Sequence, residues 1–138
     1  MNTEEIIEKA KQIRKMGKTV IDIAENLGIN IGYNNLDPKK FPAYNIRTED
    51  KMSIILNSKI NNKSRNVLCA HELGHALLHN NKIINHFGKE ISIEEYEANL
   101  FAVALLFDED DFKIPLNKMS NFELKSILDH NINLEPAF

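Results

Sequence analysis

Two histidines and a glutamate stand close together in the segment His71-Glu72-Leu73-Gly74-His75, which has the form H-E-x-x-H. On a helix, histidines four residues apart lie about 40° apart around the axis and about 6 Å apart along it. Both imidazoles can therefore reach one metal ion from the same side. Glu72 can reach a water on that ion and take its proton, which is the arrangement of zinc hydrolases.

The residues around this motif predict one long, buried helix. A strand-like run, 52–56, precedes the motif, and residues 61–80 have the pattern of a helix that is apolar nearly all round from Val67 onward. A helix that is apolar on every side is a buried one. Histidines and a glutamate inside it need partners, because burying them unpaired costs free energy. Two core histidines bonded to the backbone are the alternative, but the complete motif favours a metal site.

A zinc site needs a third protein ligand, and the sequence offers three candidates. His79 continues the spacing, but it lies about 12 Å along the helix axis from His71, a gap that metal bonds of about 2 Å cannot span. His86 falls in a predicted loop and is a weaker candidate. Glu95, on the next predicted helix, is the best one, and Asn99 one turn later can orient a ligand by hydrogen bonding.

Three neighbouring glutamates compete for the role of third ligand: Glu94, Glu95 and Glu97. Helical geometry lets only one of them face the two histidines. Glu95 has Ala98 and Ala102 beside it, and such small residues let two helices approach closely. On the same helical wheel Glu97 points about 160° away and Glu94 about 100° away. We therefore expect Glu97 at a solvent-exposed or edge position.

Two acidic segments, the one around Glu95 and the run 108–111, can also be explained without a metal ion. Ser92 and Glu95 fit a capping box, which would occupy the carboxylate that the metal needs. We favour the ligand role for Glu95, because the paired motif requires a third ligand. The acidic run 108–111 is more typical of a solvated corner than of a calcium loop, since it lacks the glycine and the terminal glutamate of an EF-hand.

The segment 71–79, H-E-L-G-H-A-L-L-H, and the following segment 95–106, E-Y-E-A-N-L-F-A-V-A-L-L, together resemble the ImmA/IrrE family of metallo-endopeptidases. Members of that family carry E-x-x-A-N/D-x-F-A-x-x-L-L after the zinc helix, and this pattern matches at Glu95 and Asn99. The same spacing occurs in thermolysin-like gluzincins, whose third ligand is that glutamate. Members usually continue with Met-Pro, whereas this chain has Phe107-Asp108, a departure that affects the exit of the second helix.

The resemblance implies a single zincin-like domain over residues 1–138, of the α+β class. A small three-stranded sheet would pack on the H-E-x-x-H helix and on a second metal-ligand helix, with flanking helices. The implied function is a zinc-dependent endopeptidase that cleaves a specific regulatory protein, such as a helix-turn-helix repressor of a phage or mobile element. Zn²⁺ would be held by His71, His75 and Glu95. Glu72 would act as general base on a metal-activated water, and Asn99 would orient a ligand.

A non-catalytic alternative belongs to a different class of function. It is a zincin-fold binding or sensor module that acts on a repressor by contact. The complete set of ligand and base residues argues against this alternative. The sequence does not single out a hydrogen-bond donor for the transition state, and the candidates are Tyr33, Tyr44, Tyr96, His79 and His130.

The remaining elements can be placed by their periodicity and their turn residues. Helices are expected at 3–16, 18–27, 61–80, 92–107 and 120–130, and strands at 29–33, 43–47 and 52–56. Thr3 is expected to cap the first helix, and Ser120 with Glu123 the last one. As in zincins, an edge strand of the sheet could receive an extended peptide substrate.

Composition limits the cellular partners. The chain has 138 residues, a net charge of -3 and 43% hydrophobic residues, which is ordinary for a globular protein. No basic patch predicts direct contact with nucleic acid, and the helix-turn-helix-like run 20–29 lacks a basic recognition helix. No apolar run is long enough to span a membrane, and the acidic N-terminus does not resemble a signal peptide. The single cysteine, Cys69, predicts a core residue in a reducing compartment, hence a cytoplasmic location.

Overall fold

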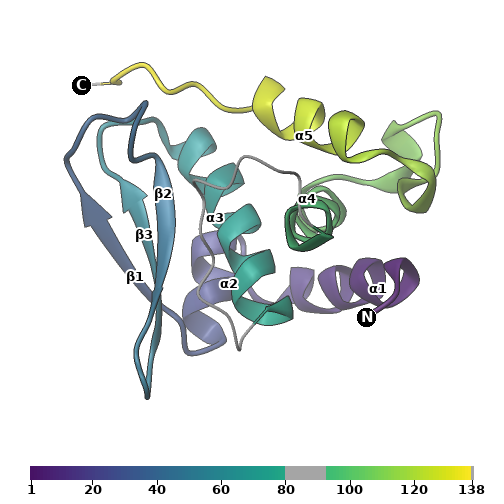
Figure 1. The fold of residues 1–138 in the computed structure, drawn as a ribbon, viewed down its shortest axis with the longest axis horizontal. Helices are drawn as coiled ribbons and strands as arrows, with labels where there is room; N and C mark the ends of the chain where they lie inside the picture. Colours follow the sequence, from purple (N-terminus) through teal and green to yellow (C-terminus); the bar gives the residue numbers. More distant parts are fainter. Residues whose placement is uncertain (80–92, 138) are drawn as a thin grey trace.

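The computed structural model describes residues 1–79 and 93–137, which form an α+β arrangement around one hydrophobic core (Figure 1). A small sheet lies on one side, α3 and α4 lie beside each other, and α1 and α5 both pack on α4. The helices are α1 (Thr3–Ile13), α2 (Val20–Asn26), α3 (Asn62–Leu78), α4 (Ile93–Leu106) and α5 (Asn121–His130), and the strands are β1 (Asn30–Asn34), β2 (Ala43–Arg47) and β3 (Met52–Asn57). The predicted fold class is therefore confirmed.

The sheet has the strand order β1-β3-β2, with β1 parallel and β2 antiparallel to the central β3. Ile54 and Leu56 of β3 are fully buried, so this face of the sheet packs on the helices. Ala43 and Asn45 of β2 pair with Leu56 and Ile54 and therefore point to the same inner face. The ends of all three strands lie within one residue of the sequence prediction.

The helix α4 runs through the centre of the described structure. Every residue from 98 to 105 is buried, and the helix contacts α1, α3 and α5. By contrast, α3 is less uniformly buried than its apolar sequence predicts, since Leu68, Leu77 and Leu78 are only half-buried. The buried side of α3 carries the motif and faces both α4 and the sheet.

Hydrogen-bonding side chains cap the N-termini of α1, α2, α3 and α5, with one difference from the sequence prediction. Asn2, and not Thr3, caps α1, because its side chain accepts a 2.9 Å hydrogen bond from the backbone N–H of Glu5. Thr3 already belongs to the first turn of α1, so that prediction was wrong. Ser120 caps α5 in a capping box with Glu123, as predicted.

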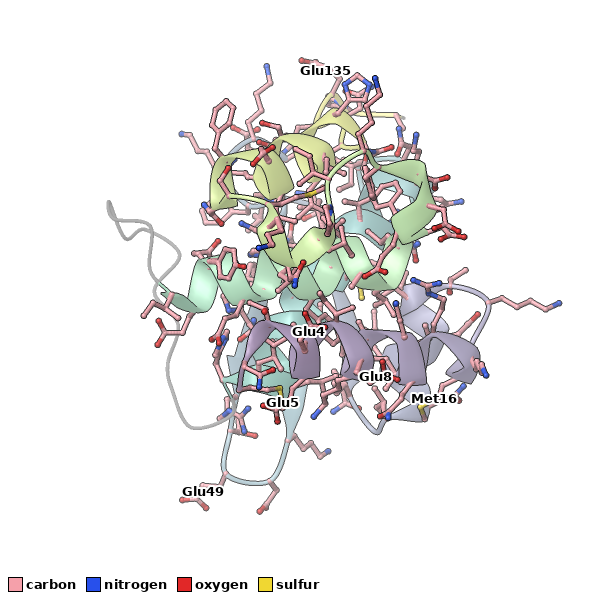
Figure 2. All side chains as sticks on the ribbon, turned by 90° about the vertical axis from the view of Figure 1, so that its right-hand side faces the viewer. Glu4, Glu5, Glu8, Met16, Glu49 and Glu135 are labelled. Carbon is pink, nitrogen blue, oxygen red and sulfur yellow. The ribbon has the colours of Figure 1, made fainter. Side chains whose placement is uncertain are left out.

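The first helix has the predicted amphipathic pattern. Ile6, Ile7, Ala10 and Ile13 are buried against the core, whereas Glu4, Glu5 and Glu8 lie on the outer side (Figure 2). The predicted last turn of this helix is a separate 3₁₀ turn, Arg14–Met16. In residues 1–79 and 93–137, no helix is long and apolar enough to cross a bilayer.

The exit of α4 is held by a cation from the N-terminal part of the chain. The helix ends at Leu106, just before the Phe107-Asp108 pair that departs from the usual family pattern. The Arg14 guanidinium donates hydrogen bonds to the carbonyl oxygens of Ala104 and Phe107. A cation at a helix C-terminus satisfies free carbonyls and complements the helix dipole.

Candidate metal centre

Three residues expected to bind metal converge between α3 and α4. His71 Nε2 lies 3.4 Å from Glu95 Oε2, and His75 Nε2 lies 2.8 Å from Glu95 Oε1. One ligand atom from each of the three side chains can be chosen so that all lie within 4.8 Å of one another. Tetrahedral bonds of about 2.0–2.1 Å place ligand atoms roughly 3.3 Å apart, so the spacing and the donor types fit a zinc ion.

The protonation of these three groups follows from their burial and their mutual contacts. Burial outweighs the hydrogen bond to Glu95 and lowers the pKa of His75. Burial also opposes protonation of His71, but the hydrogen bond to Glu95 and the charge of Glu72 prevail and raise the pKa of His71. Burial opposes ionisation of Glu95, yet its hydrogen bonds with both histidines hold its pKa well below the usual range. Glu95 is therefore a carboxylate, the form that binds metals.

The predicted general base, Glu72, is 3% exposed and lies beside the ligand pair on α3. Its Oε1 accepts a 2.6 Å hydrogen bond from Nδ2 of Asn45 on β2. Asn45 was missed from the sequence, although one signal was present. It is a polar residue on the inner face of a strand, opposite the buried Ile54.

Asn99 lies behind His71 and connects it to α5. Asn99 is 4% exposed and shares a side-chain hydrogen bond with His71 that helps to raise the pKa of His71. Its Nδ2 donates a 2.8 Å hydrogen bond to Oδ1 of Asn121, the first residue of α5. This geometry is compatible with the predicted orienting role of Asn99, which stays a prediction.

Close approach of α3 and α4 brings the ligands together. A Cβ atom on Gly74 would lie 3.1 Å from the Cα atom and 3.2 Å from the carbonyl oxygen of Ala98, and 3.2 Å from the Phe101 ring. Few Cβ atoms are packed so tightly, so the helices approach along a glycine and an alanine. Ala98, one of the small residues singled out beside Glu95, thus lies at the helix contact.

Comparison with known proteins agrees with this arrangement. The chain matches the IrrE N-terminal-like domain, a peptidase family (Peptidase_M78), over residues 24–132. The chain belongs to this family. It is also 35% identical over 111 residues to an uncharacterized immunity region protein 2 of Bacillus phage phi105, covering 77% of this chain and 68% of that protein. No solved structure matches the chain significantly. The resemblance to ImmA/IrrE proteins is confirmed, and this membership indicates a metallopeptidase.

The surroundings of Glu97 differ in part from the expectation of a solvent-exposed or edge position. Glu97 is not at a solvent-exposed position, because its side chain is only 18% exposed and its Oε1 lies 3.0 Å from Nε2 of His79. His79, the C-cap residue of α3, is buried in turn against His75. A helical wheel does not include the reach of a side chain, so it could not predict the contact between Glu97 and His79. Within the described residues, the three-residue metal group excludes His79.

Other residues considered from the sequence are not part of this group. His86 and Ser92 lie outside the described residues, so the proposed capping box of Ser92 and Glu95 is not described. Cys69 is fully buried, and burial, with the charges of Glu72 and Glu25, raises the pKa of its thiol to about 12. A thiol that keeps its proton is a poor metal ligand.

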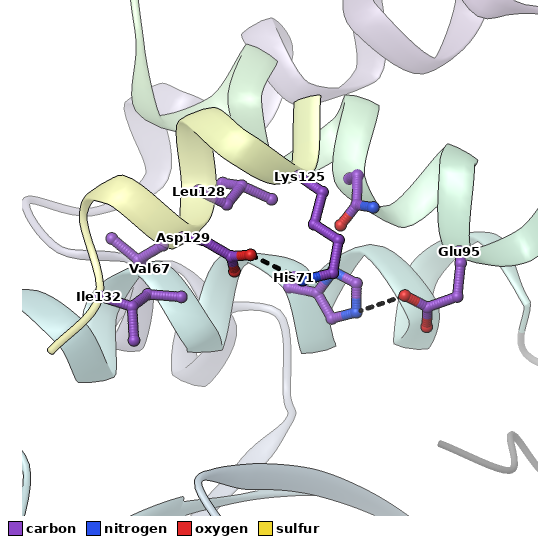
Figure 3. A pocket seen from close by; sticks show the side chains of 8 residues that line it. Val67, His71, Glu95, Lys125, Leu128, Asp129 and Ile132 are labelled. Carbon is purple, nitrogen blue, oxygen red and sulfur yellow. Dashed lines mark hydrogen bonds and ion pairs between the residues drawn. The ribbon is translucent and has the colours of Figure 1, made fainter. Parts of the chain in front are cut away.

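A cavity of about 140 Å³ adjoins the metal group between α3, α4 and α5. Figure 3 shows His71 between Glu95 and Asp129, with Val67, Leu128 and Ile132 on the side away from Glu95. Lys125 and Asp129 form an exposed ion pair at 2.6 Å. The family member therefore has a recess with an apolar side and a charged rim directly beside two proposed ligands, His71 and Glu95.

Proposed function

We propose that this chain is a zinc-dependent endopeptidase that cleaves a specific regulatory protein, such as a helix-turn-helix repressor, in the cytoplasm. The observation that carries the proposal is the approach of His71, His75 and Glu95 to within 4.8 Å, with Glu72 beside them. The family is one of peptidases, and the phage relative carries the name of an immunity region, which supports a regulatory substrate.

Each residue of the site has a distinct task in this proposal. His71, His75 and Glu95 would hold zinc, which supplies a Lewis acid for the peptide carbonyl and acidifies water. Glu72 takes a proton from the attacking water and passes it to the leaving amide nitrogen. The hydrogen bond from Asn45 holds the Glu72 carboxylate against the sheet while these transfers occur.

The surroundings of the site support an extended peptide as substrate. Strand β2 pairs only with β3 in the described part of the chain, so its second edge can accept a substrate strand by backbone hydrogen bonding. The same strand carries Asn45, so a peptide on this edge would pass close to Glu72. The cavity, whose apolar side is formed by Val67, Leu128 and Ile132 and whose rim carries Lys125 and Asp129, would then receive one side chain next to the scissile bond.

The decisive experiment is incubation of the zinc-loaded protein with a helix-turn-helix repressor, chosen by searching the genes next to its own. Intact mass spectrometry would follow the appearance of two complementary fragments. We expect cleavage by the wild type and a rate lower by about 10² to 10⁴ for Glu72→Gln, because removal of a general base typically costs this much. Glu8→Gln, at an exposed position on α1, is the matched control and should cleave like the wild type.

Two results would contradict the proposal. Undiminished cleavage by a zinc-loaded Glu72→Gln protein would remove Glu72 from the mechanism. Binding of the repressor without cleavage by the wild type would favour a module that acts by contact.

A further inference from the structure

We propose that His79 and Glu97 are positioning residues for His75 and raise the zinc affinity of the site. The inference rests on the proposed metal-binding role of His75. His79 Nδ1 lies 3.1 Å from His75 Nδ1, and His79 Nε2 lies 3.0 Å from Glu97 Oε1. Three side chains thus form a continuous row that begins at the metal group and ends at a carboxylate.

The row is shielded from water. The exposed fraction of the side chain is 0% for His75, 6% for His79 and 18% for Glu97. At this burial a ring nitrogen without a partner costs free energy, so each nitrogen of His79 needs a partner inside the protein. The structure supplies one for each, His75 on one side and Glu97 on the other.

Metal binding fixes the direction of every hydrogen bond in the row. His75 Nε2 faces Glu95, so it is the nitrogen that would bind zinc, and a ligating nitrogen carries no proton. The proton of the neutral His75 ring is then on Nδ1, which donates to Nδ1 of His79. His79 must carry its own proton on Nε2, and this nitrogen donates to the Glu97 carboxylate. One arrangement of protons therefore satisfies all four contacting atoms.

This arrangement has a direct effect on the metal. A hydrogen bond from the second ring nitrogen fixes the orientation of a ligating histidine and makes it a better donor, and losing such a partner typically costs about 10- to 100-fold in metal affinity. The carboxylate of Glu97 strengthens the acceptor, because a hydrogen bond accepted from Nε2–H of His79 raises the electron density of the ring at Nδ1. His79 thus acts through His75 without touching the metal.

His79 could instead have a purely structural role, which would not affect the metal affinity of His75. His79 ends α3, and its contact with Glu97 on α4 could simply tie the two helices together. Two substitutions separate the roles, because each keeps one of the two contacting atoms. In His79→Asn the amide oxygen can take the place of Nδ1 and accept from His75, while the contact with Glu97 is lost. In His79→Gln the amide nitrogen can take the place of Nε2 and donate to Glu97, while the acceptor for His75 is lost.

The experiment measures zinc affinity of the full chain by competition with a chromogenic chelator. We expect His79→Asn to bind zinc within a few-fold of the wild type and His79→Gln to bind it about 10- to 100-fold more weakly. Glu97→Gln, which keeps an acceptor for His79, should bind more tightly than Glu97→Ala. Glu8→Gln, at an exposed position on α1, is the control and should match the wild type.

The opposite order, with His79→Gln tight and His79→Asn weak, would overturn the inference in favour of a helix tie. Equal affinity of all variants and the wild type would overturn it as well. Both outcomes leave the proposed function intact, whereas a wild type that binds no zinc would contradict the proposed function itself.

A second measurement needs no substitution. Nitrogen-15 NMR of the imidazoles in the zinc-loaded wild type reports which ring nitrogen carries the proton. We expect the proton of His75 on Nδ1 and that of His79 on Nε2. A proton on Nδ1 of His79 would overturn the inference, because that nitrogen could not then accept from His75.

Discussion

His71 and His75 of α3 have hydrogen-bond partners of different chemical types on the side away from Glu95. On the His71 side the row runs through two amides, Asn99 and Asn121, to the start of α5. On the His75 side it runs through a second imidazole, His79, to the carboxylate of Glu97. The side chain of His71 is 18% exposed and its pKa is raised, whereas His75 is fully buried and burial lowers its pKa.

This difference shows how two histidines of one proposed metal site can differ in exposure and in pKa. Neutral amides orient a ring but add no net charge. The pKa of His71 therefore depends mainly on its burial, on Glu95 and on Glu72. A buried ring that binds a metal takes up part of its positive charge, and burying that charge costs free energy. A row that ends in a carboxylate offsets this cost. We therefore expect the two sides to respond differently to substitution and to pH, although both rings face Glu95 through Nε2.

The largest effect on metal binding is expected at Glu95, which contacts both histidines. Glu95 contacts both His71 and His75, so Glu95→Ala should remove the metal and abolish activity. Glu97→Ala reaches the site only through His79, so it should weaken zinc binding by about 10-fold at most, less than His79→Gln does. Metal content and zinc affinity of both purified variants measure the difference. Retention of metal by Glu95→Ala and its loss from Glu97→Ala would reverse the assignment of the third ligand.

The next effect tests the amide side. Asn99→Leu removes the partner of His71 and should weaken zinc binding by about 10- to 100-fold. Asn99→Asp keeps an acceptor for His71, and Asn121 can turn its amide to donate to it, so this variant should bind zinc at least as tightly as the wild type. Chelator competition on the two variants gives the comparison. Equal weakening in both would mean that Asn99 contributes packing alone.

The opposite pKa shifts of the two histidines predict opposite pH dependence in the metal-free protein. A raised pKa gives stability that is present below the usual pKa of about 6.5 and is lost as the pH rises through the folded value. A lowered pKa gives stability that is lost as the pH falls below about 6.5. Relative to the wild type, His71→Gln should therefore be more destabilising at about pH 6 than at about pH 8. His75→Gln should show the opposite trend and be less destabilising at about pH 6 than at about pH 8.

Chemical denaturation with a chelator present, at both pH values, would measure these differences in the free energy of unfolding. The same trend for both variants would show that the two sides are electrostatically alike.

The smallest effect on the metal is expected at Cys69, which lies on α3 outside both rows. Cys69→Ser should leave zinc content and activity unchanged. The free energy of unfolding should fall by about 1–3 kcal/mol, because a hydroxyl replaces a buried thiol in apolar surroundings. Metal analysis and thermal unfolding of the variant test both parts. Loss of zinc from a folded Cys69→Ser protein would assign the thiolate to the site.

Much of this arrangement could be predicted from the sequence, because it depends on local periodicity. The motif residues, the strand positions and the face of α4 that carries Glu95 and Asn99 all follow from the periods of helix and strand. The two extra partners, Asn45 and His79, could not be placed in this way. Asn45 comes from a strand distant in sequence, and His79 lies where the chain leaves the helix, so only the packing of elements reveals their contacts.

The motif H-E-x-x-H leaves two positions open, yet burial restricts the first and the contact between α3 and α4 restricts the second. Leu73 is fully buried, and any Cβ at Gly74 would push Ala98 away by a few tenths of an ångström. Ala98 lies one turn from Glu95, so such a shift would move the third ligand relative to the histidines. An engineer who grafts this site onto another scaffold would therefore need to copy the interhelical spacing along with the ligand residues.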